Sequence, residues 1–257
     1  MTSRSEPVQA ILRELEKKGS RKVREEMLTR YGITAPKAHG VPLGVIKAMG
    51  KEIGTDHELA LALWDTGWYE ARLLTSFIDD PSKVTAAQMD RWARDFDNWG
   101  VCDTLCFNLF DRTPHAWRKV EQWTKKDAEF VKRGGFALLA CLALHDKTTG
   151  DGPFLKSLRL VEAGADDDRN FVKKGVSWAL RLIGRRSQSL NAAAVTLCER
   201  LAASSSPAAR WNGKQALREL TSPLVRRQMA ARTAKPTRNS QQSRNTKQPR
   251  IKAGGRK

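Results

Sequence analysis

Hydrophobic residues recur at helical spacing along most of the chain, and alternating strand patterns are scarce. The segment 171–186, FVKKGVSWALRLIGRR, shows the pattern most clearly. Val172, Val176 and Ile183 fall on one side of a helix there, and polar residues fall on the other. The pattern predicts an all-α protein.

Residues that begin and end helices divide residues 5–230 into segments of about a dozen residues. Ser5 precedes a helix that Gly19 closes, and Ser20 precedes one that ends at Gly32. Roughly fourteen helices and no strand are expected from such signals. Further start signals are Thr55 with Glu58, Thr85 with Gln88, and the pairs Thr113-Pro114, Ser206-Pro207 and Ser222-Pro223.

Two helical architectures fit this pattern. Short loops imply antiparallel pairs, and a spacing of roughly 35 to 45 residues per pair is typical of an α-α superhelix built from HEAT-like repeats. No sequence identity between repeats is visible. On periodicity alone, an irregular all-helical globule is equally consistent.

Composition narrows the class of protein. The 257 residues are 40% hydrophobic, enough to bury a substantial core. The chain has no run of 18 apolar residues and its first residues are charged, so we expect neither a membrane span nor a signal peptide, but a cytoplasmic protein. Its four cysteines include no C-x-x-C pair, so we expect reduced thiols and no zinc site.

The net charge is +18, and half of it lies in residues 231–257, which contain nine basic residues and no acidic one. This polar tail has too few apolar residues to offset its ordering entropy, so we expect it to be disordered and to contact polyanions without specificity. We expect residues 1–230 to form one helical domain. Because that domain is basic too, a nucleic acid is the expected partner.

Two segments combine aromatic and charged residues. In Trp92–Phe110, Trp99 and Asp103 are four residues apart, which brings them to the same side of a helix. In Phe171–Arg186, Trp178 lies away from the apolar stripe, which is unusual for a tryptophan. Its neighbours at helical spacing are the cations Lys174, Arg181 and Arg185.

Together with Tyr69-Glu70-Ala71-Arg72 and Phe130-Val131-Lys132-Arg133, these segments resemble the DNA alkylation repair family, the AlkD-type alkylpurine DNA glycosylases built from HEAT-like repeats. The similarity covers roughly residues 20 to 225. It implies that a concave face binds duplex DNA, with Asp103, Trp99 and Trp178 at the damaged nucleotide. The resemblance also implies DNA contacts by Arg133 and Arg181, and we expect the neighbouring cations Lys174 and Arg185 to join them.

The implied activity is that of a monofunctional glycosylase, which hydrolyses the N-glycosidic bond of N3- or N7-alkylated purines in duplex DNA. Asp103 would stabilise oxocarbenium-like charge or orient water, and the indoles would favour a cationic base. No metal and no organic cofactor is implied. We expect a monomer that associates with the bacterial nucleoid while acting on DNA.

Other interpretations stay open at this stage. Asp103 could be a first-turn carboxylate of a helix beginning near Gly100, and Trp99 could be an ordinary core residue. Gly100 departs from the family, which usually has an aspartate there, and it would be harmless as a helix N-cap but not in a chemical role. A non-catalytic protein that binds damaged or distorted nucleic acid is therefore the alternative. A peptide-binding solenoid is a third, which the basic domain disfavours.

Overall fold

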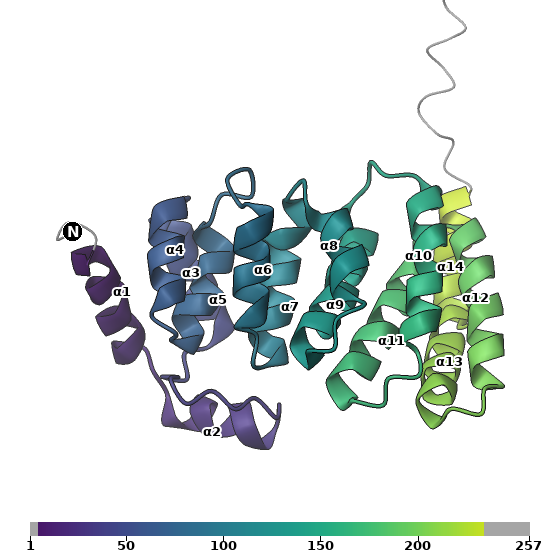
Figure 1. The fold of residues 1–257 in the computed structure, drawn as a ribbon, viewed down its shortest axis with the longest axis horizontal. Helices are drawn as coiled ribbons and strands as arrows, with labels where there is room; N and C mark the ends of the chain where they lie inside the picture. The colour runs from purple at the N-terminus through teal and green to yellow at the C-terminus, as the bar shows by residue number, and fades with distance from the viewer. Residues whose placement is uncertain (1–4, 234–257) are drawn as a thin grey trace, which may run out of the picture.

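The computed structural model describes residues 5–233 (Figure 1). Within this range the chain forms fourteen α-helices, one 3₁₀-helix and no strand, which confirms the all-α prediction. No helix in the described range is long and apolar enough to cross a membrane. The helices are α1 (Ser5–Lys17), α2 (Arg21–Thr29), α3 (Leu43–Ile53), α4 (His57–Asp65), α5 (Tyr69–Ile78), α6 (Ala86–Arg94), α7 (Trp99–Asn108), η1 (Phe110–Arg112), α8 (Ala116–Trp123), α9 (Glu129–His145), α10 (Asp151–Gly164), α11 (Asn170–Gly184), α12 (Gln188–Ala202), α13 (Pro207–Leu220) and α14 (Pro223–Thr233).

The helices form two rows. In the inner row, α5, α7, α9, α11 and α13 each pack on the next (Figure 1). The outer row consists of α4, α6, α8, α10 and α12, which cover the inner helices. Inner neighbours are in contact throughout, whereas α10 and α12 alone make comparable contacts within the outer row. The stack therefore curves toward the inner row, as expected for a HEAT-like solenoid rather than an irregular globule.

Local sequence explains many of the helix starts. The hydroxyls of Ser20, Thr85 and Ser206 each accept a hydrogen bond from the backbone N–H three residues later, as predicted. At α4 the predicted cap was wrong by one position. Asp56, not Thr55, accepts the N–H of Leu59, because the aspartate directly precedes the helix and has extended backbone angles.

The core runs along the interface between the rows. Trp64 of α4 and Trp92 of α6 are buried and stack with ring centroids 4.2 Å apart. Phe110 meets both Trp92 and Trp123, which extends the aromatic packing toward α8. These tryptophans are thus core residues, and they fix the spacing of the outer helices.

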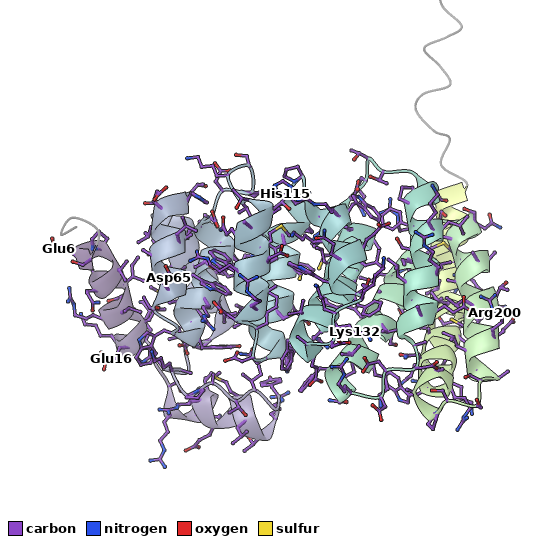
Figure 2. All side chains as sticks on the ribbon, in the orientation of Figure 1. Glu6, Glu16, Asp65, His115, Lys132 and Arg200 are labelled. Carbon is purple, nitrogen blue, oxygen red and sulfur yellow. The ribbon has the colours of Figure 1, made fainter. Side chains whose placement is uncertain are left out.

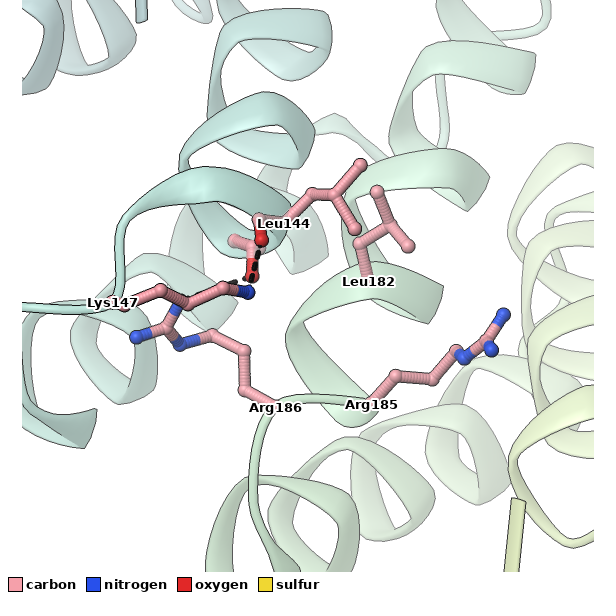
Figure 3. A pocket seen from close by; sticks show the side chains of 6 residues that line it. Leu144, Lys147, Leu182, Arg185 and Arg186 are labelled. Carbon is pink, nitrogen blue, oxygen red and sulfur yellow. Dashed lines mark hydrogen bonds between the residues drawn. The ribbon is translucent and has the colours of Figure 1, made fainter. Parts of the chain in front are cut away.

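Arg186, just after α11, connects successive helix pairs. Its guanidinium donates hydrogen bonds to the carbonyls of Leu142, Ala143, Asp146 and Thr149, at or after the end of α9. Figure 3 shows it beside a groove of about 470 Å³ between the ends of α9 and α11. The contact joins the backbone of one repeat to the side chain of the next.

The predicted boundary after residue 230 falls within α14, which continues to Thr233. The remainder of the predicted disordered tail, residues 234–257, lies outside the described residues. From α3 to α14, each helix packs on at least one other helix of the stack.

Candidate DNA-binding and catalytic site

The centre of the candidate site is an ion pair between α7 and α9. Arg133 donates from Nε to Oδ1 of Asp103 at 2.9 Å and from Nη2 to Oδ2 at 2.6 Å. Its Nη1 donates to the carbonyl of Phe171, at the start of α11, at 2.6 Å. The Arg133 side chain is 8% exposed and that of Asp103 is 18% exposed. One guanidinium therefore fixes the carboxylate from both oxygens and joins three inner helices.

Burial governs the electrostatics of this pair. Burial raises the pKa of Asp103, and the charge and hydrogen bonds of Arg133 oppose the increase. Burial also acts against the charge of Arg133, but the adjacent Asp103 outweighs it and raises the pKa of the guanidinium. Arg133 thus keeps its proton, and Asp103 is a desolvated carboxylate with a single fixed counter-charge.

Trp99 is the first residue of α7 and is partly exposed. Its indole Nε1 donates to the carbonyl of Tyr31 at 2.9 Å. The two rings meet edge to face with centroids 6.4 Å apart. The segment after α2 therefore packs against the start of α7, where it fixes the orientation of the indole.

Gly100 is not a helix N-cap, so that interpretation of the departure from the family is wrong. The cap of α7 is Asn98, whose side chain accepts the N–H of Val101. Gly100 is buried, and a Cβ at this position would lie 2.5 Å from the hydroxyl of Tyr69. Tyr69 thus occupies the space that any larger residue at position 100 would need.

The start of α7 at Trp99 also removes the first-turn interpretation of Asp103. This residue is the fifth of the helix, and its two oxygens accept from a side chain instead of the free backbone N–H groups. Its carboxylate therefore belongs to the ion pair.

The second tryptophan lies on the other side of α9. Gly175 of α11 packs against Arg133, since a Cβ there would lie 3.5 Å from Cγ of Arg133. Trp178 follows almost one turn later and is half-buried against the core. Three adjacent helices of the inner row thus carry the candidate residues. Trp99 and Asp103 lie on α7, Arg133 lies on α9 and Trp178 lies on α11.

The four cations predicted to bind DNA have different environments. Lys174 is exposed, whereas Arg133 forms an ion pair with Asp103. Arg181 pairs with Glu219 of α13 at 2.8 Å, and Arg185 reaches the same carboxylate at 3.4 Å. Sequence reasoning missed Glu219, because nothing in its local spacing indicates a partner 38 residues earlier. DNA contact by these residues stays a prediction.

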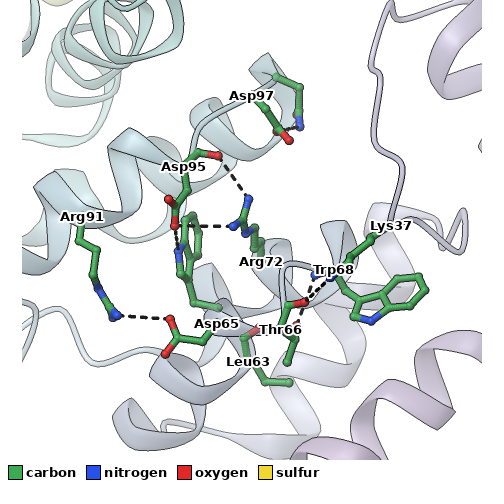
Figure 4. A network of polar contacts seen from close by, with 11 residues as sticks. Lys37, Leu63, Asp65, Thr66, Trp68, Arg72, Arg91, Asp95 and Asp97 are labelled. Atoms are coloured by element: carbon green, nitrogen blue, oxygen red, sulfur yellow. Dashed lines mark hydrogen bonds and ion pairs between the residues drawn. The ribbon is translucent and has the colours of Figure 1, made fainter.

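The segment Tyr69–Arg72 supports the site from behind. One oxygen of Glu70 accepts the backbone N–H groups of residues 39–41. Arg72 donates to the carbonyl of Asp95 at 3.2 Å (Figure 4). Its guanidinium also lies over the Trp64 ring. The Arg72 contact therefore holds the loop that leads into α7, and the Glu70 contacts hold the segment before α3.

Asp167, in the loop before α11, is paired with two cations. Asp167 accepts from Lys132 at 2.9 Å, and from Arg169 through both oxygens. Figure 2 shows Lys132 on α9, one residue before Arg133. Hydrogen bonds from Arg169, followed by Lys132, keep the pKa of Asp167 below its usual range. The carboxylate therefore carries full charge and orders the loop before α11.

The curved two-row stack of helices is that of a HEAT-like repeat protein, and its inner row carries a largely buried carboxylate. A model of the DNA alkylation repair enzyme family matches residues 11–220. The chain belongs to this family. A solved structure described as "a new family of proteins related to the HEAT-like repeat DNA glycosylases with affinity for branched DNA structures" is similar with a TM-score of 0.67.

That structure is 20% identical in sequence, and the similarity covers 75% of this chain and 82% of the other, so it supports the fold. No curated protein matches the chain.

Proposed function

We propose that the protein is a DNA glycosylase that hydrolyses the N-glycosidic bond of positively charged N3- or N7-alkylated purines in duplex DNA. The observation that carries the proposal is the Asp103 carboxylate, largely buried and held from both oxygens by Arg133. Catalytic groups are effective when they are fixed before the substrate arrives, and this carboxylate is fixed.

Alkylation at N3 or N7 leaves the base with a positive charge, so it is a good leaving group without a strong general acid. As the bond between C1′ and the base nitrogen breaks, its electron pair neutralises the base and positive charge grows on the sugar. A carboxylate near C1′ stabilises that charge and orients the water that adds to C1′. The proton of this water passes to the carboxylate or to solvent.

The other residues have supporting roles in this proposal. Arg133 is a positioning residue, since its donors are directed to Asp103 and the Phe171 carbonyl. Trp99 and Trp178 offer aromatic faces, on which a cationic base or sugar gains about 0.5 to 2 kcal/mol depending on desolvation. Lys174 is exposed for a phosphate contact, while Arg181 would have to exchange Glu219 for a phosphate.

A second candidate is a non-catalytic protein that binds damaged or branched DNA. The affinity for branched DNA attributed to the similar solved structure favours it. So does Gly100, where the family resemblance leads one to expect an acidic residue. The two candidates differ in one observable, namely release of a base.

The test is single-turnover release of 7-methylguanine and 3-methyladenine from methylated linear duplex DNA at saturating enzyme. Asp103→Asn should lower the rate by about 10² to 10³ with little change in DNA affinity, because it removes the charge and retains the shape. Asp90→Asn is the matched control, since Asp90 also accepts from a cation, Lys119, but lies on the outer row. It should leave the rate unchanged.

Thermal unfolding would verify that both variants are folded. An unaltered rate in folded Asp103→Asn would eliminate the mechanism. Absence of release by the wild-type protein would favour the second candidate.

A further inference from the structure

Two grooves flank α8 on the outer row. The first, of about 640 Å³, lies between α6 and α8 and ends at the first turn of α9. The second, of about 520 Å³, lies between α8 and α10. Both follow from the curvature of the stack, because neighbouring outer helices diverge where inner ones are in contact.

Exposed cations line both grooves. The first contains Arg94, Lys125 and Lys126, and the second contains Arg118, Lys156 and Arg159. We call these six residues the outer basic surface.

Few acidic groups neutralise these cations. Asp90 lines the first groove, but both its oxygens already accept, from Lys119 at 2.6 Å and from Trp123 at 2.9 Å. Glu121 lies 3.9 Å from Arg159, the limit of an ion pair. The other five cations form no ion pair with any residue in the range 5–233. Asp127 is the remaining acidic group in the first groove, so the outer basic surface keeps a positive excess.

The arrangement of the cations suits a regular polyanion. The two sets lie on either side of one helix, α8, and a helix with its side chains is about 10 to 12 Å across. Duplex DNA carries one negative charge for about every 1.7 Å of its axis, so it can meet both sets at once. The floors of the grooves are apolar, with Val131 in the first and half-buried Trp117 in the second. Sugar and base edges can pack there.

One linear duplex cannot serve both the candidate site and this surface. The site lies on the inner row and the outer basic surface on the outer row, so a duplex on both would have to bend around the stack. Duplex DNA resists this, because its persistence length is about 150 base pairs. A junction changes direction without bending an arm.

We infer that the outer basic surface binds a second duplex arm of a branched DNA whose first arm lies on the inner row. The inference rests on the proposed DNA binding of the inner row, but not on base excision. Because this surface contacts only one arm of a branched DNA, it raises the affinity for branched DNA relative to linear DNA. Its contacts are with phosphates and therefore do not depend on the base sequence.

The experiment compares binding of a four-way junction and of a linear duplex built from the same sequences, by fluorescence anisotropy between 50 and 200 mM salt. One triple variant, Arg94→Gln/Lys125→Gln/Lys126→Gln, neutralises the first groove. A second, Arg118→Gln/Lys156→Gln/Arg159→Gln, neutralises the other. The matched control is Arg13→Gln/Lys17→Gln/Lys18→Gln, which removes the same charge from α1 and the residue that follows it, at the end of the stack.

Each groove variant should lower the log–log salt slope of junction binding by about 2 to 3, since each phosphate contact contributes about 0.9. It should weaken junction binding about tenfold at the higher salt, and leave both linear-duplex affinity and base release from linear DNA within about twofold. The control should change the affinities for the junction and for the linear duplex to the same extent.

An equal loss for junction and linear duplex would overturn the inference, because it would reduce the surface to general electrostatic attraction. Equal wild-type affinities for the two DNAs, or unchanged junction binding by the groove variants, would also overturn it. Failure of the proposed function has a separate readout, because it would show as absent base release whatever the junction affinity.

Discussion

Two ion pairs with a buried cation, one in each row, show how similar residues can have different roles. On the inner row, Asp103 of α7 accepts from Arg133 of α9. On the outer row, Asp90 of α6 accepts from Lys119 of α8 at 2.6 Å. In the outer pair the lysine is 2% exposed and the carboxylate 42% exposed, whereas both inner partners are largely covered.

The two carboxylates consequently differ in pKa direction. At Asp90, burial opposes ionisation, but Lys119 and Trp123 together lower the pKa. At Asp103, burial outweighs Arg133 and raises the pKa. The outer carboxylate neutralises a buried lysine and thereby serves the fold. In its ionised form the inner one carries its charge where water is scarce, so it can act strongly on charge that develops in a substrate.

The largest effect is expected when the cation of the inner pair is removed. Arg133→Gln leaves Asp103 without its counter-charge, so its pKa should rise further, by about 1 to 3 units. The excision rate needs the ionised form and therefore increases with pH. Its midpoint should move to higher pH by that amount, with a rate loss of about tenfold or more below it. Lys119→Gln should not move the midpoint. Single-turnover rates measured as a function of pH for the wild type and both variants test this prediction.

Arg133→Lys controls for local packing. It keeps the charge and loses the second hydrogen bond, so its midpoint should stay near that of the wild type while the rate falls modestly. If both Arg133 variants shared the wild-type profile, Arg133 would not tune Asp103.

Stability should separate the two members of the outer pair. Asp90→Ala leaves the buried ammonium of Lys119 unpaired, which should cost about 3 kcal/mol of unfolding free energy. Lys119→Met leaves a carboxylate that water can reach, so about 1 kcal/mol is expected. Urea unfolding of both variants measures the difference. The reverse order would mean that the exposed carboxylate, not the lysine, carries the desolvation cost.

A smaller effect is expected at the start of the helix that carries Asp103. Gly100→Ala forces the Tyr69 hydroxyl to move, at about 1 to 3 kcal/mol. Tyr69→Phe removes that hydroxyl and should recover part of the loss in the double variant. A double-variant cycle by thermal unfolding tests this. Additive losses would show that the two residues do not compete for space.

Local sequence was sufficient for the helices and for many of their ends. Serine and threonine caps act over three residues, so their partners can be identified in the sequence. The pair Thr113-Pro114 misled because the Thr113 hydroxyl donates to the carbonyl of Phe110, closing the 3₁₀-helix rather than opening α8. Here the same side chain had two local uses, and the spacing did not distinguish them.

The partners within the site could not be predicted in the same way. Trp99 and Asp103 are one helical turn apart, so their common side follows from the sequence. Arg133 is 30 residues from Asp103, and Tyr31 is 68 residues from Trp99. Such contacts depend on how one repeat packs on another, which periodicity does not specify. The family resemblance brought Arg133 to attention, but not its pairing with Asp103.

The guanidinium of Arg186 also affects how the molecule opens. In a linear array, the free energy needed to open one repeat depends on its coupling to the next. By binding four carbonyls at and beyond the end of α9, Arg186 makes α9 and α11 a single cooperative unit. Amide protons of these helices should therefore exchange together, and later than those of α1 or α14 at the ends. Arg133, which holds Asp103, should then lie in a segment that opens late.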